Sequence, residues 1–294
     1  MSEFHGTRKN RSYFEGWYFK HQNQGHTVAF IPGINYDENG IKSAFVQVIT
    51  DDISCSISFP FSSFRICPHG IAIRVGNQIF SDRMIQVNLN TPEIRCQGTI
   101  KYGPLTPPKS NVMGPFRFVP FMECNHGVIS MKHSLKGSLT LNGTKIDFSG
   151  GTGYIEKDWG TSFPKSYLWA QCNRFSEPSC SIMVSIANIP FAGFCFQGCI
   201  GIINFQGKEY RLATYNGVRV VRCDETGFLL VQRSCVLEAE LFINSPQVLL
   251  APKSGAMTRT IRENAACRAR FRFYRDGMLL FDLQSGEAGV EYVK

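Results

Sequence analysis

Residues 153–175, GYIEKDWGTSFPKSYLWAQCNRF, gather side chains that could carry out acid–base chemistry. Glu156 and Asp158 are two residues apart, so on an extended strand they project from one face, with Lys157 on the other. A carboxyl group beside a second carboxylate in an apolar cavity has a raised pKa and remains a proton donor near neutrality. Such an acid could protonate an alkene or an oxygen atom.

Aromatic and amide side chains in the same region could complete such a site. Trp169, Gln171 and Asn173 alternate along WAQCN, so a strand would present them on one face as an apolar wall with two neutral hydrogen-bonding groups. The aromatic rings that could face a developing carbocation are Trp17, Tyr18, Trp159 and Trp169. A structural interpretation stays open, in which both carboxylates bind backbone amides at a strand corner and the tryptophans fill the core.

Other common sites are missing from the sequence. SGGTG at residues 149–153 is not a nucleophile elbow, no phosphate-binding P-loop occurs, and the Gly151/Gly153 pair lacks the third glycine of a dinucleotide fingerprint. The spacing of Cys195 and Cys199 comes closest to a metal motif, but no second pair follows. We therefore expect no nucleotide cofactor and no metal. His126, in MECNHGVISMKH, is the histidine nearest to motif-rich sequence, although a lone histidine in a strand is more often packed or exposed than catalytic.

The elements that must position these residues are predicted to be β-strands. The 294-residue chain is 43% hydrophobic and 18% charged, which is typical of a globular protein. Short alternating or apolar runs are separated by Gly, Pro, Asn or Asp throughout, and Asn142-Gly143 and Asp276-Gly277 are hairpin signals. We expect an all-β antiparallel fold of sandwich or barrel type.

Charge and targeting signals restrict the partners. The net charge of +8 includes Arg268, Arg270 and Arg272, which alternate with apolar residues as on the solvated face of a half-buried strand, so nucleic-acid binding is not expected. The 11 cysteines, without a CxxC pair, indicate reduced and mostly buried thiols. The basic N-terminal residues lack the apolar stretch of a signal peptide, and no long apolar run follows. We expect a soluble, cytoplasmic protein.

Two pairs of similar segments suggest an internal duplication. NGTKIDFSGGTG, from Asn142, aligns with DGMLLFDLQSGEAG, from Asp276, and YFEGWYF, from Tyr13, aligns with YIEKDWG, from Tyr154. The two offsets, about 135 and about 141 residues, agree well enough to predict two copies of one β unit. The predicted domains are residues 1–152 and 153–294.

Three long motifs resemble the tocopherol cyclase family, in particular its bacterial cyclase-like members. They are YFEGWYFK (13–20), PFMECNHGVISMKHSLKG (120–137) and residues 153–175. The resemblance implies two lipocalin-like β units. It also implies an isomerase that closes a chromanol-type ring by adding a phenol oxygen of a prenylated hydroquinone across the nearest double bond of the isoprenoid tail. That reaction needs a proton donor, an apolar cavity and a proton acceptor, and no redox cofactor or metal.

The resemblance assigns roles to the motif residues. Asp158 or Glu156 would protonate the alkene, and the other carboxylate or His126 would accept the phenol proton. Glu15 and Lys20 would orient the quinol ring. The residues implied in substrate binding are Trp17, Tyr18, Lys20, Glu123, Asn125, Trp159, Trp169, Gln171 and Asn173. Asn125 stands where the bacterial members usually have tyrosine, and this departure could change the substrate.

Two other functions are compatible with the sequence. The chain could be a non-catalytic carrier that encloses a hydrophobic isoprenoid or lipid in an apolar cavity. It could also use a reactive cysteine in redox chemistry, which requires an exposed thiol of low pKa. An enzyme is favoured over a carrier. In either case the partner is a hydrophobic small molecule, obtained through peripheral contact with a membrane, while the oligomeric state stays open.

Overall fold

The computed structural model describes residues 4–67, 70–119, 122–191 and 194–294. Apart from four short 3-10 helices, the regular structure of these residues consists of strands, as the alternating sequence predicts. The strands of the first half are β1(Tyr13–Asn23), β2(His26–Tyr36), β3(Lys42–Thr50), β4(Ser54–Pro60), β5(Phe64–Ile66), β6(Ala72–Val75), β7(Gln78–Ser81), β8(Met84–Asn90), β9(Arg95–Tyr102), β10(Cys124–Leu141), β11(Thr144–Asp147) and β12(Thr152–Gly160).

The second half continues in the same manner. Its strands are β13(Tyr167–Cys172), β14(Ser181–Phe191), β15(Phe194–Phe205), β16(Lys208–Ala213), β17(Arg219–Asp224), β18(Gly227–Gln232), β19(Cys235–Phe242), β20(Gln247–Lys253), β21(Ala256–Arg275) and β22(Met278–Val293). The 3-10 helices are η1(Gly6–Arg8), η2(Phe61–Ser63), η3(Gly114–Phe118) and η4(Thr214–Asn216). No helix in the described ranges is both long and apolar enough to cross a membrane.

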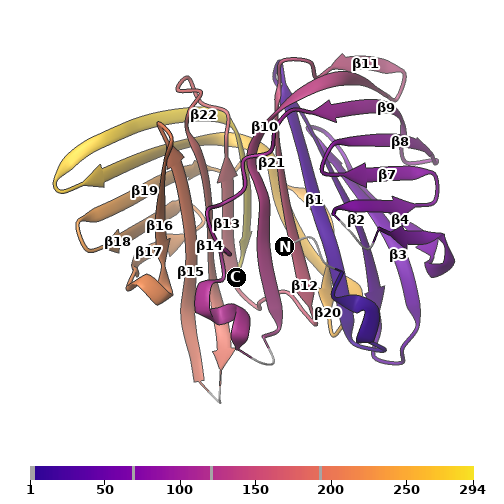
Figure 1. Ribbon diagram of the computed structural model, residues 1–294, viewed down its shortest axis with the longest axis horizontal. Coiled ribbons are helices and arrows are strands. Elements are labelled where there is room, and N and C mark those ends of the chain that lie inside the picture. The colour runs from indigo at the N-terminus through magenta and orange to yellow at the C-terminus, as the bar shows by residue number, and fades with distance from the viewer. Residues whose placement is uncertain (1–3, 68–69, 120–121, 192–193) are drawn as a thin grey trace. The chain divides into compact units, whose positions relative to one another are not determined.

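The strands form two antiparallel sheets (Figure 1). The first has the order β4-β3-β2-β1-β12-β10-β9-β8-β7-β6-β5, with β11 paired to β10. The second has the order β16-β15-β14-β13-β22-β21-β19-β18-β17, with β20 paired to β21. In each sheet the first strand of the half lies beside its last strand, so the two halves repeat one topology, as the internal similarity predicts. Both sheets remain open and are not closed into barrels.

Both predicted hairpin turns are confirmed. Asn142 and Gly143, between β10 and β11, have φ angles of 49° and 91°, and Asp276 and Gly277, between β21 and β22, have 52° and 77°. Two successive residues with positive φ make the turn whose twist matches that of paired strands, and Asn-Gly and Asp-Gly are the pairs that adopt it most readily.

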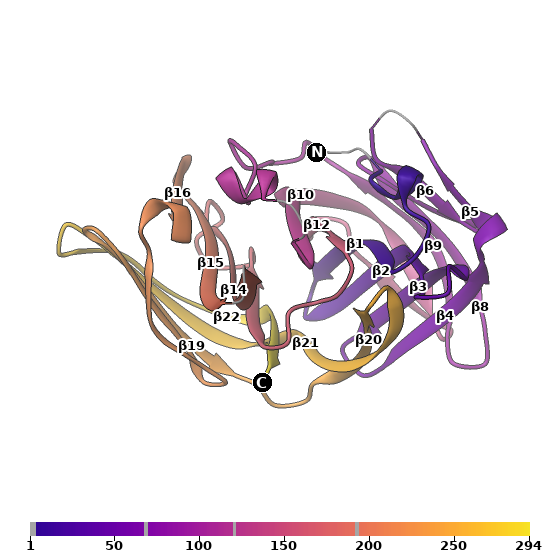
Figure 2. The same ribbon diagram turned by 90° about the horizontal axis from the view of Figure 1, so that it is seen from below.

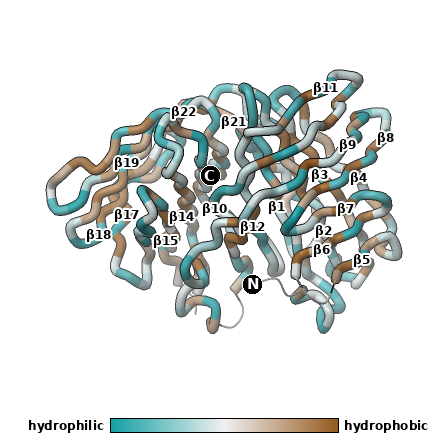
Figure 3. Tube along the Cα trace, turned by 45° about the horizontal axis from the view of Figure 1, so that its top comes forward, coloured by the Kyte–Doolittle hydropathy of each residue, from teal (hydrophilic) through white to brown (hydrophobic). Residues whose placement is uncertain are grey.

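Each half has its own hydrophobic core. In the first sheet Trp17, Phe19 and Phe30 pack with Phe80 and Ile155. Figure 2 shows the strands of this sheet curling around the space that these side chains fill. The second core has a separate set, which includes Leu168, Val184, Leu230, Phe271 and Phe281. The alternation of hydrophobic and hydrophilic residues along the strands (Figure 3) follows from burying one face of each strand.

The chain divides into two compact units, and each unit is made of three separate segments of the sequence. The first comprises Met1–Pro107, Phe121–Phe163 and Val248–Thr260, and the second comprises Pro108–Pro120, Pro164–Gln247 and Ile261–Lys294. Strand β12 is hydrogen-bonded between β1 and β10, so it belongs to the first sheet. The chain passes to the second sheet between Gly160 and Tyr167. The domain boundary at residues 152/153 stays a prediction.

The side-chain amides of two glutamines form hydrogen bonds with backbone groups of their own units. In the first unit, Gln47 accepts from the backbone N–H of Leu250 and donates to its carbonyl, at 2.8 and 2.9 Å. In the second, Gln232 of β18 accepts from the N–H of Ala213 and donates to the carbonyl of Arg211 in β16, both at 2.9 Å. Gln232 thereby links β16, at one end of the second sheet, to β18, which is next to the strand at the other end.

Candidate active site

The pairing of β12 with β10 assembles the central group of candidate residues. His126 lies directly opposite Asp158, and Val128 lies opposite Glu156. Residues opposite each other in an antiparallel pair project from the same face of the sheet. His126, Glu156 and Asp158 therefore share one face, and it is the face opposite to the hydrophobic core that contains Ile155. The prediction that Glu156 and Asp158 share a face is confirmed.

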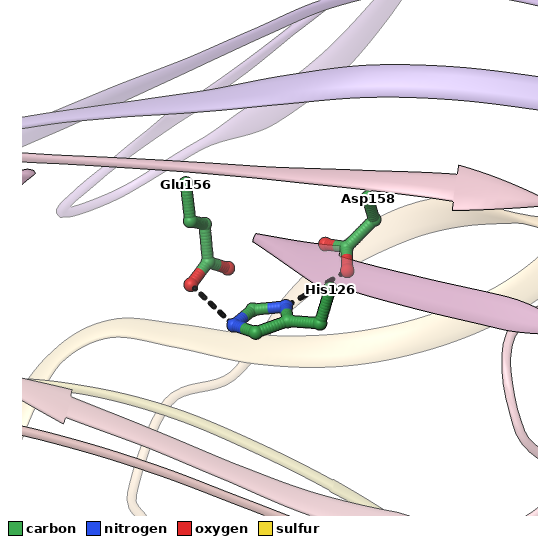
Figure 4. A group of neighbouring side chains, drawn as sticks. All are labelled: His126, Glu156 and Asp158. Carbon is green, nitrogen blue, oxygen red and sulfur yellow. Dashed lines mark hydrogen bonds and ion pairs between the residues drawn. The ribbon is translucent and has the colours of Figure 1, made fainter. Parts of the chain in front are cut away.

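The imidazole of His126 lies between the two carboxylates (Figure 4). Its Nδ1 is 2.8 Å from Oδ1 of Asp158, and its Nε2 is 3.5 Å from Oε2 of Glu156. His126 and Glu156 are buried, while Asp158 is partly exposed. The group thus combines an imidazole with two acids in a region that has little access to water.

Two neutral donors extend this group. The hydroxyl of Tyr154 donates to Oε2 of Glu156 at 2.5 Å, and the thiol of Cys124 lies 3.9 Å from Oδ1 of Asp158. Burial, together with the nearby carboxylates, raises the pKa of both the Tyr154 hydroxyl and the Cys124 thiol well above their usual values. Both side chains therefore stay protonated near neutral pH.

The electrostatics favour a protonated His126. Burial alone would lower the pKa of the imidazole, but the carboxylates of Asp158 and Glu156 overcome this effect and raise the pKa to about 9. Near neutral pH the ring is an imidazolium with a carboxyl group on either side. Such a chain of groups can take up a proton at one end and release it at the other.

The same three side chains have the spacing of metal ligands. One donor atom from each of His126, Glu156 and Asp158 can be chosen so that all lie within 4.8 Å of one another. Carboxylate and imidazole donors suit Zn²⁺ and similar ions. A metal ion bound here would have to displace the proton that His126 holds. Cys195 is exposed and Cys199 is buried, both on β15, and among the residues that the structure describes neither belongs to a comparable group.

A second charged group occupies the other face of β1 and β12. Nζ of Lys157 is 2.5 Å from Oε1 of Glu15, and both side chains are almost inaccessible, at 1% and 0% exposure. The ammonium also lies 5.0 Å from the ring centre of Trp17 and 5.1 Å from that of Trp159. This face belongs to the core of the first unit, so the structure separates these residues from Glu156, Asp158 and His126.

Glu15 also holds the N-terminal segment. Its carboxylate accepts hydrogen bonds from the backbone N–H groups of His5 and Gly6 and from the hydroxyl of Tyr13, the last at 2.5 Å. The ring of His5 stacks on Trp159 at 4.4 Å. Burial would raise the pKa of Glu15, but the contacts with His5, Lys157 and Tyr13 lower it overall. Glu15 is therefore a carboxylate with its charge fully compensated.

The other candidates of the first unit divide between the two faces. Tyr18 lies opposite Glu156 and Lys20 lies opposite Tyr154, so both buried residues share the face of the carboxylates. Asn125 lies opposite Trp159, and its amide donates to the carbonyl of Trp159 at 3.4 Å. The carbonyl of Glu123 accepts from the N–H groups of Thr161 and Ser162.

The remaining candidates belong to the second unit. Trp169, Gln171 and Asn173 are buried and alternate with Leu168, Ala170 and Cys172 of the hydrophobic core. Strand β13 therefore presents Trp169 and Gln171 on the predicted face, and Asn173 follows directly after the end of the strand. Glu291 lies opposite Trp169 on β22 and accepts from the hydroxyl of Tyr167 at 2.6 Å.

Sequence reasoning missed several of these polar residues. Tyr154 precedes Glu156 by two positions and Cys124 precedes His126 by two, so strand alternation could have placed each beside its neighbour. Glu263 and Glu291 are paired across β21 and β22, and Glu263 is fully buried. No local pattern distinguishes these two glutamates from the other charged residues of their strands.

Comparison with known proteins matches a family and finds relatives both in sequence and in fold. The sequence model of a family described as tocopherol cyclase-like matches residues 91–291. A protein of Oryza sativa subsp. japonica named "Probable tocopherol cyclase, chloroplastic" is 28% identical over 121 residues. These residues are 40% of this chain and 26% of the rice protein, so the chain matches about a quarter of that relative's length.

Two solved structures share the fold over most of the chain. CghA in complex with Sch210972 has a TM-score of 0.59 and 11% identity, over 96% of this chain and 89% of its own. Kievitone hydratase from Nectria haematococca has a TM-score of 0.57 and 13% identity, over 95% and 88%. These likenesses confirm the expected all-β fold of two lipocalin-like units.

Proposed function

The chain belongs to the tocopherol cyclase-like family, and on this basis we propose that it is an enzyme that cyclises a prenylated hydroquinone, or a related isoprenoid, to a chromanol-type ring. The reaction is an isomerisation started by a proton and uses no redox cofactor. The observation that carries the proposal is the position of His126 between Asp158 and Glu156 on a buried face outside the core. The identity of the substrate is part of the proposal.

In the proposed reaction the substrate gains one proton at the alkene and loses one proton from the phenol. His126 passes its proton to Glu156 or Asp158, and the carboxyl group so formed gives that proton to the CH carbon of the nearest tail double bond, which leaves a tertiary cation. The phenol oxygen then forms the new C–O bond, and its proton returns to the group through the emptied carboxylate or His126. The imidazolium in contact with both acids can supply either of them again. The negative carboxylate left after the first step stabilises the cation.

The compensated pair on the other face is a useful contrast. The Glu15 carboxylate is held by two backbone N–H groups and Lys157. A purely structural role for Glu156 and Asp158 would require the same kind of arrangement around them. Glu156 and Asp158 instead share an imidazole whose charge depends on pH. We therefore assign the chemistry to Glu156, Asp158 and His126 and a positioning role to Glu15.

Some of the other candidates receive binding or positioning roles in the proposal. Tyr18 and Lys20 share the face of the reactive group and are proposed to contact the quinol. Trp17 and Trp159 pack on Lys157 and are proposed to fix the position of β12. Glu123, next to the start of β10, is proposed to contact the substrate as well. Asn125 lies on the face of Trp159, and Trp169, Gln171 and Asn173 belong to the second unit, so the proposal gives these four residues no contact with the substrate.

Turnover in heavy water tests the function directly. The purified protein is incubated without oxygen with a prenylated hydroquinone in D₂O, and the product is analysed by mass spectrometry and NMR. We expect a chromanol with one deuterium at the former alkene CH carbon, because the added proton comes from an exchangeable group. Ring closure without incorporation of deuterium would contradict proton initiation. Tight binding without ring closure would identify a non-catalytic carrier instead.

A further inference from the structure

Three hairpin turns of the second unit lie together. They are residues 205–208 between β15 and β16, residues 232–235 between β18 and β19, and residues 275–278 between β21 and β22. The N–H of Asp276 donates to the carbonyl of Ser234 at 3.0 Å, which joins the second and third turns. The ring of Tyr210 lies 5.1 Å from Nζ of Lys208 and 5.9 Å from Cζ of Arg275, which joins the first and third.

The third turn exposes two large apolar side chains in succession. Met278 is 66% exposed and Leu279 is 51% exposed. Neighbouring residues of a strand project from opposite faces, so both sides of the hairpin tip are apolar. Figure 1 shows the hairpin of β21 and β22 in yellow, with its tip at the left of the picture. On β22 the residues that pack in or against the core begin with Leu280 and Phe281, and Met278 and Leu279 are not among them.

Positive charge surrounds this apolar tip. The turns carry Lys208, Arg233 and Arg275, and their only acidic residue is Asp276. Nε of Arg275 is 3.2 Å from Oδ2 of Asp276, in a pair whose side chains are 41% and 59% exposed. Three cations and one carboxylate leave a net charge of +2 for the three turns. Tyr210, packed on Phe273 with its ring between two cations, adds an aromatic ring of the kind that is frequent at membrane interfaces.

We propose that these three turns are a membrane-docking surface that takes an anionic lipid bilayer. Met278 and Leu279 enter the acyl boundary, while Lys208, Arg233 and Arg275 contact the lipid headgroups. Exposed apolar side chains ringed by basic residues match an anionic interface in both hydrophobicity and charge. The docking itself does not depend on the reaction. Its use rests on the proposed function, because a prenylated quinol is dissolved in membranes and has to be taken from one.

Vesicle sedimentation tests the surface. We expect the protein to bind vesicles of phosphatidylcholine with phosphatidylglycerol and to bind pure phosphatidylcholine vesicles at least about tenfold less, since each basic residue contributes to attraction by anionic lipid. The double variant Met278→Ser/Leu279→Ser and the double variant Lys208→Glu/Arg233→Glu should each lose at least about tenfold in binding to the anionic vesicles.

Matched controls lie elsewhere on exposed surface. Ile41 is also 66% exposed, and Arg219 is an exposed residue of β17. Ile41→Ser and Arg219→Glu should bind anionic vesicles as the unchanged protein does. Equal loss in the controls, or full binding by both double variants, would overturn the docking surface. A change in sedimentation coefficient of the free protein caused by Met278→Ser/Leu279→Ser, with vesicle binding unchanged, would overturn it in favour of contact between two copies.

The test separates this inference from the proposed reaction. With a short-chain substrate dissolved in detergent, the tip variants should keep the turnover of the unchanged protein, and with substrate supplied in anionic vesicles their rate should fall with their binding. Vesicle binding that depends on the tip, in a protein without cyclase activity, would leave the docking surface standing and remove the proposed function. Turnover by a protein that does not bind vesicles would remove the docking surface and leave the proposed function standing.

Discussion

Glu15 and Glu156 project from opposite faces of the paired strands β1 and β12, and each accepts a hydrogen bond from the tyrosine two residues before it. The Tyr-x-Glu motif therefore occurs twice with the same local geometry. Its chemical setting differs, because Glu15 faces Lys157 and Glu156 faces His126. A lysine supplies a constant charge, whereas a histidine can exchange its proton near physiological pH. The first four predictions below follow from this difference and from the face on which each motif lies.

The proposed activity should depend on protonated His126. Because the pKa of His126 is raised to about 9, kcat/KM should be constant at neutral pH and should fall about tenfold per pH unit above pH 9. In Asp158→Asn one of the two raising carboxylates is gone, so the decline should begin at lower pH. Both profiles are measured by initial rates of ring closure. A decline at the same pH in both proteins would contradict the assignment.

Neutralising the reactive group should stop turnover without unfolding the protein. Glu156→Gln and His126→Gln each remove a group that gives or relays the proton, and we expect kcat to fall by a factor of at least about 100. Asp147→Asn is the control, because Asp147 is an exposed carboxylate in β11 of the same unit. Its rate should be unchanged. Circular dichroism and the melting temperature show whether a slow variant is still folded.

The buried pair of Lys157 and Glu15 should act on stability. Lys157→Met leaves the Glu15 carboxylate buried without its cation, and removal of one partner of such a pair costs about 3–5 kcal/mol in the free energy of unfolding. Lys157→Met combined with Glu15→Gln removes both charges and should recover part of that loss. Urea denaturation measures both values.

Glu15→Gln alone separates a positioning role from a catalytic one. We expect a lower melting temperature but an unchanged kcat when the rate is measured well below that temperature. The pH profile should also keep the decline set by His126. A loss of kcat of about 100-fold in fully folded Glu15→Gln would show that Glu15 takes part in the reaction.

Removal of metal ions should leave the rate of cyclisation unchanged. His126, Glu156 and Asp158 have ligand-like spacing, but a metal ion competes with the proton on His126 that the mechanism uses. Dialysis against EDTA should therefore have no effect on kcat, and added Zn²⁺ should inhibit. Loss of activity on dialysis that Zn²⁺ restores would assign the site to metal catalysis.

Two other histidines should make the first unit sensitive to acid. Burial lowers the pKa of His21 to about 3, and burial together with His21 lowers that of His133 to about 3. Below pH 6.5 the unfolded chain takes up protons that the folded protein excludes, so stability falls between pH 6.5 and pH 3. From pH 7 to pH 5 each histidine should cost about 2 kcal/mol.

Urea denaturation at the two pH values measures this loss. His133→Gln should reduce the loss between pH 7 and pH 5, whereas His26→Gln, which changes an exposed histidine, should leave it unchanged. Equal losses in the two variants would mean that His133 is not the group responsible.

Strand alternation alone predicts which of the candidate side chains share a face. It places Glu156 and Asp158 on one face, as the structure has them, and Trp169, Gln171 and Asn173 on another, of which Trp169 and Gln171 lie on β13 while Asn173 follows its end. The same rule, applied more strictly, would also have placed Trp159 away from Asp158, because the two are adjacent in sequence. The aromatic residues are grouped with the carboxylates by proximity along the chain, and the pleat of the strands separates Trp17 and Trp159 from them, while Tyr18 shares their face.

Strand pairing could not be obtained from the sequence. His126 and Asp158 are 32 positions apart, and β11 lies between their strands in the chain, so only the register of β10 on β12 makes them neighbours. That register also includes two irregularities, between Val128 and Ser130 and between Ser130 and His133. A local pattern does not encode such shifts, because each depends on packing between distant segments.

The side-chain amide of Gln232 occupies part of one edge of the second sheet. Strand β16 ends that sheet, and such a strand exposes unpaired peptide groups on which a strand of another chain can assemble. Gln232 occupies the N–H of Ala213 and the carbonyl of Arg211 at the C-terminal end of this edge strand. One glutamine thereby occupies two of the peptide groups on which another strand could pair, at a place where a closed barrel would need another strand.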